Sequence, residues 1–143
     1  MNSEDLMRKF FEGDKFAIEA GIEIIEVNED RAVVRAYIGP KHLNANGCVQ
    51  GGMLYTIADF AFAVLGNFRH PITVTQCGSI SYVAAAYTGV VTATATETVR
   101  RGHNTVSDVV VADADGNTVC VCRFNGFVKD TDRDEVFAKL TEK

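Results

Sequence analysis

The sequence predicts an α+β fold in which a curved antiparallel β-sheet wraps around one long helix. The chain has 143 residues, the length of a single domain with one core. Residues 51–67 form one apolar stretch of helical length, whereas the other apolar runs are short and rich in β-branched residues. Because this helix is apolar on nearly every side, it must be covered all round, and a curved sheet is the simplest cover.

The remaining elements follow from the turn residues between apolar runs. Residues 3–19 are expected to form one or two short helices, and residues 39–50 a loop with Pro40 and Gly47 as breakers. Strands are expected at 22–28, 31–38, 72–82, 89–101, 104–114 and 118–129. The predicted order is β-β-α-β-β-β-β with meander connections. One sheet does not easily enclose the whole helix, so a second copy of the chain is expected to cover the rest, which predicts a homodimer.

Composition and charge exclude several classes of protein. The net charge is −5, and no basic stretch is interleaved with aromatic residues, so a nucleic-acid partner is not expected. The N-terminus lacks the features of a secretory signal, which predicts a cytoplasmic protein. The apolar helix falls short of the ~20 residues of a membrane span and carries a central Asp59, so no membrane partner is expected. The four cysteines and three histidines lack metal-ligand spacing, so no metal site is expected.

Asp59 is the main candidate for a functional residue. No Lys or Arg lies between Lys41 and Arg69, so the helix itself offers no cation to neutralise this carboxylate. A buried carboxylate without partners costs several kcal/mol or gives up its charge. The nearly apolar helix favours a chemical role for Asp59 over the alternative of a plain surface aspartate.

The start of the same helix offers a second candidate feature. Gly51 and Gly52 present backbone N–H groups without helical acceptors, at the end of the helix where its dipole favours negative charge. The pair could bind a developing oxyanion, and Asn44, Asn46 and Gln50 add neutral amides nearby. Glycine pairs at helix starts are also common for structural reasons alone.

Helix geometry separates these two features within one chain. Gly51 and Asp59 are eight residues apart, which is about 12 Å along a helix and beyond the reach of an aspartate side chain. If two helices run antiparallel across a two-fold axis, Asp59 of one subunit can face Gly51 of the other. Two equal sites in a homodimer would follow.

The run HLNANG at 42–47, together with Gly51-Gly52 and Asp59, resembles the signature of hotdog-fold acyl-CoA thioesterases, in particular the PaaI-like and thioesterase-superfamily-member-2 branch. The resemblance covers about residues 15–129 of a single domain at 1–143, flanked by a short helical N-terminal segment and a C-terminal tail. It implies a hotdog fold, a dimer or dimer of dimers, and hydrolysis of acyl-CoA to acid and CoA. No cofactor is implied beyond the CoA of the substrate.

The resemblance also implies roles for individual residues. It assigns the Gly51 N–H to polarise the thioester carbonyl, Asn44 to position carbonyl or water, Asp59 to act as general base or nucleophile, and Thr75 to orient the attacking water. Many relatives have His where this chain has Gln50, which cannot exchange a proton near neutral pH. The residues implied to bind the substrate are Gly52, Tyr82, Val83, Ala84, Ala85, Arg100, Arg101, Gly102, His103 and Asn104.

Two alternatives remain at the level of sequence. A non-catalytic acyl-CoA or lipid-binding hotdog module would share the fold, but it has little use for a carboxylate beside the thioester. A hotdog dehydratase would need a catalytic histidine near the helix start, and this chain has Gln50 at that position. The acyl group stays open between aryl groups and short or medium chains.

Overall fold

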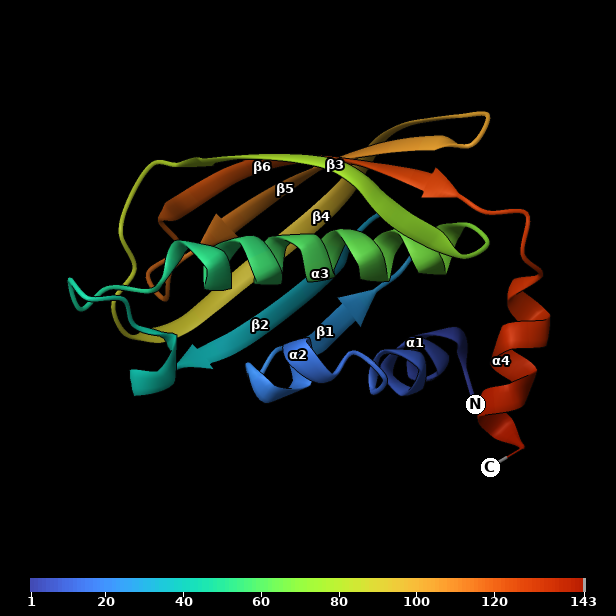
Figure 1. The fold of residues 1–143 in the computed structure, drawn as a ribbon, viewed down its shortest axis with the longest axis horizontal. Coiled ribbons are helices and arrows are strands. Elements are labelled where there is room, and N and C mark those ends of the chain that lie inside the picture. Colours follow the sequence, from blue (N-terminus) through green and yellow to red (C-terminus); the bar gives the residue numbers. More distant parts are fainter. Residues whose placement is uncertain (143) are drawn as a thin grey trace.

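A computed structural model describes residues 1–142 of the chain. It contains one six-stranded antiparallel sheet that curves around the long helix α3, as Figure 1 shows. This arrangement confirms the predicted fold class. The strands are β1 (Glu23–Val27), β2 (Ala32–Ile38), β3 (Thr73–Tyr82), β4 (Gly89–Arg101), β5 (Asn104–Ala112) and β6 (Thr118–Val128). The helices are α1 (Ser3–Phe11), α2 (Lys15–Glu19), the 3₁₀ turn η1 (Pro40–His42), α3 (Gly51–Arg69) and α4 (Arg133–Thr141).

The strand order is β1-β2-β4-β5-β6-β3, which differs from a simple meander. The hairpins β4-β5 and β5-β6 are meander connections as predicted, but β2 pairs with β4, and β3 pairs with β6. The chain leaves β2, crosses the face of the sheet as α3 and returns as β3 at the opposite edge (Figure 1). The meander prediction was wrong for β3 because the helix carries the chain across the sheet.

Helix α3 is the centre of the core, and most of its residues are buried. Residues spaced three or four apart share one helix face. Along one such face Gly52, Thr56, Asp59 and Ala63 remain half-buried or exposed. We call this row of four residues the open stripe.

Strand β3 lies beside α3 and forms one edge of the sheet. Its inner neighbour is β6, and within residues 1–142 no strand pairs with its outer edge. Its ten residues, TVTQCGSISY, include neither a charged residue nor a proline. Edge strands of monomeric proteins usually carry such residues because they block pairing with another chain. The outer edge of β3 is therefore suited to pair with a second strand.

The segment after β6, expected as a tail, forms the helix α4. The Asp132 side chain caps its start, and the Phe137 ring packs against the ring of Phe10 on α1 with centroids 5.6 Å apart. Arg133 donates hydrogen bonds to backbone carbonyls at the end of α3. Packing against α1 and α3, rather than the weak local pattern, stabilises this short helix.

Candidate active site

The structure supplies a partner for Asp59 that the sequence did not reveal. Strand β3 passes beside the open stripe, where Thr75 Oγ1 donates a hydrogen bond of 2.6 Å to Asp59 Oδ1. Asp59 is half-buried and Thr75 is exposed, so the pair can be reached from solvent. Thr75 was predicted to orient water; here its hydroxyl proton orients the carboxylate itself.

The surroundings of Asp59 change its acidity. Burial raises the pKa of the carboxyl above its ordinary value, and this effect exceeds that of the Thr75 hydrogen bond, which acts to lower the pKa. The negative charge of Asp14 adds to the rise. A carboxylate with a raised pKa is a stronger base, as general-base chemistry near neutral pH requires.

The start of α3 has the free N–H groups expected from its sequence. Gln50 is the N-cap, and its Oε1 accepts the Met53 N–H at 3.1 Å. Within residues 1–142, the N–H groups of Gly51 and Gly52 meet no acceptor. Gln50 thus stabilises the helix start through its oxygen, and only its NH₂ group is left to contact a ligand. The Gly51 and Gly52 amides stay open to an oxyanion.

Asn44 builds the loop that leads into the helix. Its Oδ1 accepts the backbone N–H groups of Asn46 at 2.9 Å and Cys48 at 3.2 Å, which closes a tight turn. Its Nδ2 lies 3.3 Å from Cys48 Sγ. The oxygen of Asn44 therefore holds the loop, and a contact with carbonyl or water would have to come from its NH₂ group.

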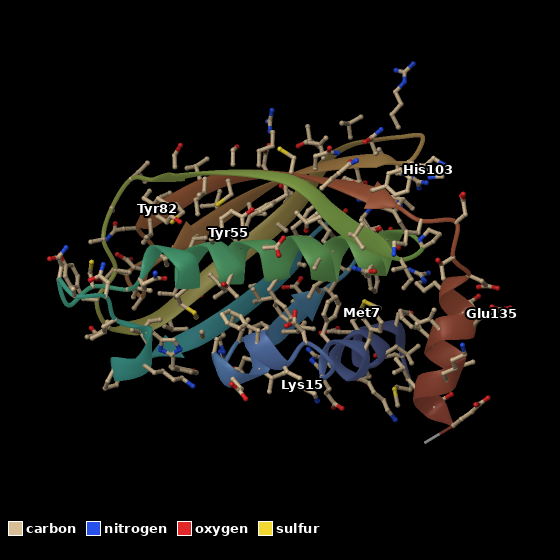
Figure 2. All side chains as sticks on the ribbon, in the orientation of Figure 1. Met7, Lys15, Tyr55, Tyr82, His103 and Glu135 are labelled. Carbon is tan, nitrogen blue, oxygen red and sulfur yellow. The ribbon has the colours of Figure 1, made fainter. Side chains whose placement is uncertain are left out.

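One predicted substrate-binding segment adjoins the helix start in the same chain. Tyr82, at the end of β3, donates a hydrogen bond of 2.9 Å from its hydroxyl to the carbonyl of Gly51. Figure 2 shows Tyr82 near the beginning of α3. Val83, Ala84 and Ala85 follow directly and are exposed. The structure thus brings this segment to Gly51, as a joint role in one site requires.

The other predicted segment lies at the far end of the molecule. The turn that includes Arg101 and Gly102 joins β4 to β5 near the end of α3, and Figure 2 shows His103 well away from Tyr82. One chain therefore does not bring the turn to Gly51. Arg100 is exposed but takes part in contacts within the chain: its Nη1 lies 3.1 Å from His70 Nδ1, and its Nε donates to the Gly102 carbonyl. Arg101 and Asn104 are exposed at the turn.

A buried polar cluster, which the sequence did not indicate, anchors this end of α3. The Glu97 side chain is 6% exposed and lies 2.5 Å from His70 Nε2. Burial alone would raise the pKa of Glu97, but hydrogen bonds from Thr105 and His70, with the charge of Arg69, outweigh it and lower the pKa. The pairing is structural, since it joins the end of α3 to β4 and β5.

Among residues 1–142, no three His, Cys, Asp or Glu side chains gather as a metal site would need. All four cysteines are free thiols, and burial raises the pKa of Cys120 to about 11 and that of Cys122 to about 12. Both buried thiols are therefore poor nucleophiles at neutral pH.

Comparisons with known proteins place this chain in a family. No protein-family model matches the chain. The chain is 33% identical over 115 residues to the acyl-coenzyme A thioesterase PaaI of Escherichia coli K12, which covers 79% of this chain and 81% of PaaI. It is also 33% identical over 79 residues to a putative esterase of Archaeoglobus fulgidus; that match spans 55% of this chain and 51% of the archaeal protein.

Solved structures give the same result at the level of the fold. The E. coli PaaI protein from the phenylacetic acid degradation operon superposes with a TM-score of 0.83 at 26% identity, covering 90% of this chain and 96% of PaaI. A hypothetical thioesterase of Streptococcus pneumoniae TIGR4, solved with coenzyme A, superposes with a TM-score of 0.77 at 27% identity. The superposition covers 83% of this chain and 96% of the S. pneumoniae protein. These similarities show that the chain belongs to the PaaI-like acyl-CoA thioesterases of the hotdog fold.

Proposed function

We propose that the protein hydrolyses acyl-CoA thioesters at a site shared between two subunits. One subunit supplies Asp59 and Thr75, and the other supplies the free N–H of Gly51. The observation that carries the proposal is the Asp59–Thr75 hydrogen bond on the open stripe, which leaves a basic, oriented carboxylate accessible to a ligand. CoA enters only as part of the substrate.

The homodimer rests on three features of the single chain. Gly51 and Asp59 lie about 12 Å apart along α3, the open stripe is uncovered, and the outer edge of β3 is unprotected within residues 1–142. Pairing two copies with antiparallel α3 helices covers the stripe and brings each Asp59 toward the other subunit's helix start. The predicted dimer of dimers and the cytoplasmic location stay predictions.

The same pairing explains why the two substrate-binding segments lie apart in one chain. Along α3, Asp59 lies between the helix start, where the 82–85 segment sits, and the helix end, where the 100–104 turn sits. With antiparallel helices, the 100–104 turn of one subunit approaches the 82–85 segment of the other. Each composite site then has both segments available for the nucleotide part of CoA.

The proposed chemistry assigns one task to each group. Thr75 holds Asp59 Oδ1, and Oδ2 takes a proton from a water molecule. The water oxygen adds to the thioester carbonyl, whose oxygen becomes negative and is held by the Gly51 N–H. The C–S bond then breaks, and the CoA thiolate leaves and takes up the proton. In the variant with Asp59 as nucleophile, its oxygen attacks first, and water hydrolyses the resulting anhydride.

A thiol-release assay over a panel of acyl-CoAs tests the proposal. The panel contains acetyl, hexanoyl, octanoyl, phenylacetyl, benzoyl and hydroxybenzoyl thioesters. Asp59→Asn keeps the shape of the side chain but removes its basicity, so turnover should fall by about 10²- to 10⁴-fold. Turnover near the parental rate in this variant, or no cleavage of any thioester by the parent, would support the non-catalytic binding module instead.

A further inference from the structure

A cavity of about 480 Å³ opens beside the start of α3 and is not used by the chemistry described above. Its volume lies within the range of about 300 to 1,000 Å³ that is usual for small-molecule sites. The apolar part of its wall comes from Phe16 and Ala20 at α2, Leu43 in the loop and Met53 on α3. The Phe16 side chain is 74% exposed there, so its ring is available to contact a ligand.

Hydrogen bonds fix the α2 wall of this cavity in place. His42 is buried, and its Nδ1 accepts the Gly39 N–H at 2.9 Å while its Nε2 lies 2.7 Å from the carbonyl of Ala20. The Ala20 carbonyl can only accept, so the proton of His42 sits on Nε2. Lys41 Nζ donates to the carbonyl of Glu19. These contacts hold a helix of five residues that would not be stable alone, so the cavity is preformed.

Several polar groups of the wall are already bonded within the chain, whereas the exposed Glu19 carboxylate and the Gln50 NH₂ group have no hydrogen-bond partner within residues 1–142. Thr56 Oγ1 donates to the Gly52 carbonyl at 2.7 Å, and Gln50 Oε1 accepts the Met53 N–H. Both nitrogens of His42 are also occupied. A ligand hydroxyl beside Thr56 or His42 would lose its water and gain little in return, which costs free energy. This part of the cavity, which the apolar side chains also line, thus suits an apolar group.

We propose that this cavity binds the acyl group of the substrate and that α2 makes the enzyme selective for apolar acyl groups longer than acetyl. The inference rests on the proposed function. Gly52 lines the cavity and adjoins Gly51, so a thioester carbonyl held by the Gly51 N–H has its acyl carbon at the cavity mouth. Each methylene group that enters the cavity strengthens binding about fourfold.

A selectivity profile tests this assignment, with the ratio of kcat/KM for octanoyl-CoA to that for acetyl-CoA as the readout. The parent should favour octanoyl-CoA at least tenfold, and Ala20→Phe, which places an aromatic ring in the cavity, should lower the ratio at least tenfold. Phe16→Ala, a truncation of an exposed side chain with little risk to folding, should lower it by a smaller factor. Ile18→Ala is the control, since Ile18 is also exposed on α2 but lines a different cavity.

If both Ala20→Phe and Phe16→Ala keep the parent's ratio of kcat/KM for octanoyl-CoA to that for acetyl-CoA, the assignment is overturned. So would a preference for hydroxybenzoyl-CoA over benzoyl-CoA in the parent.

Equilibrium binding to Asp59→Asn separates this inference from the proposed function. In that variant octanoyl-CoA should bind at least tenfold more tightly than CoA, and adding Ala20→Phe should remove most of the difference. If the parent cleaves no thioester but this difference is present, the hydrolysis proposal fails and the acyl cavity stands. If the parent hydrolyses thioesters but octanoyl-CoA and CoA bind Asp59→Asn equally, the acyl cavity fails alone.

Discussion

At the scale of single residues, Asp59 shows what a sequence can and cannot reveal. A lone carboxylate in an apolar helix is visible in the sequence as a candidate. Its partner Thr75 was named only through a family resemblance, and with a different contact, because the hydrogen bond depends on β3 crossing to the sheet edge beside α3. A contact between segments that meet only after folding has no local signal.

Thr75→Val should separate the orienting role of the hydroxyl from its bulk. The Thr75 hydrogen bond acts to lower the pKa of Asp59, so its loss should move the acid limb of the pH–kcat profile to higher pH. Loss of a hydrogen bond to a charged group should also lower kcat by about 10- to 100-fold. Thr75→Ser keeps the hydroxyl and serves as the control, with a limb near the parental position. If the acid limb lies at the same pH in Thr75→Val, Thr75→Ser and the parent, the Thr75 hydroxyl does not orient Asp59.

Asp59→Asn should stabilise the fold while it lowers turnover. The folded-state pKa of Asp59 is raised, so as pH rises the unfolded chain releases this proton first, and the folded state becomes relatively less stable. Above both pKa values this loss is complete, and Asn, which carries no charge, avoids it. Thermal unfolding at pH 7 should give a higher Tm for Asp59→Asn than for the parent, and the gap should shrink as pH falls toward about 4. A lower Tm at pH 7 would mean that the charge helps folding.

At the scale of elements, features with a local sequence signal were predicted correctly, whereas features that depend on long-range contacts were not. The start of α3 at Gly51 was predicted because the glycine pair and the apolar run mark it locally. Two other features were not predicted: the pairing of β3 with β6 and the packing of α4 on α1. Both depend on contacts between distant segments of the chain. The joining of Arg100 to His70 and of Glu97 to Thr105 has the same long-range character.

Gly51→Pro removes the N–H donor while the helix start is kept. Proline is favoured at the first helical position, and Gln50 before it has the extended backbone that proline requires, with φ −62° and ψ 136°. Loss of one oxyanion donor should lower kcat by about 10²- to 10³-fold. Gly51→Ala is the matched control, because its Cβ would meet the same Tyr82 ring at 3.3 Å but the N–H remains. If Pro and Ala reduce kcat equally, the Gly51 N–H is not the donor.

At the scale of the whole molecule, the site and the surface point to the same assembly. Within residues 1–142, the single chain leaves an unprotected edge at β3 and an uncovered stripe on α3, and it holds Gly51 and Asp59 too far apart to act on one carbonyl. The sequence could predict this separation because it follows from helix rise alone. It could not predict which sheet edge stays open, since that depends on the strand order.

Mixing two inactive variants tests the shared site directly. A heterodimer of Asp59→Asn and Gly51→Pro subunits contains one site that carries both changes and one site that carries neither. Random refolding of an equal mixture makes half of the dimers heterodimers, so activity should recover to about a quarter of the parental value. A mixture of Asp59→Asn with Asp59→Ala, which damages the same half of every site, should stay inactive. If the first mixture also stays inactive although sedimentation shows that heterodimers form, Gly51 and Asp59 do not act across the subunit boundary.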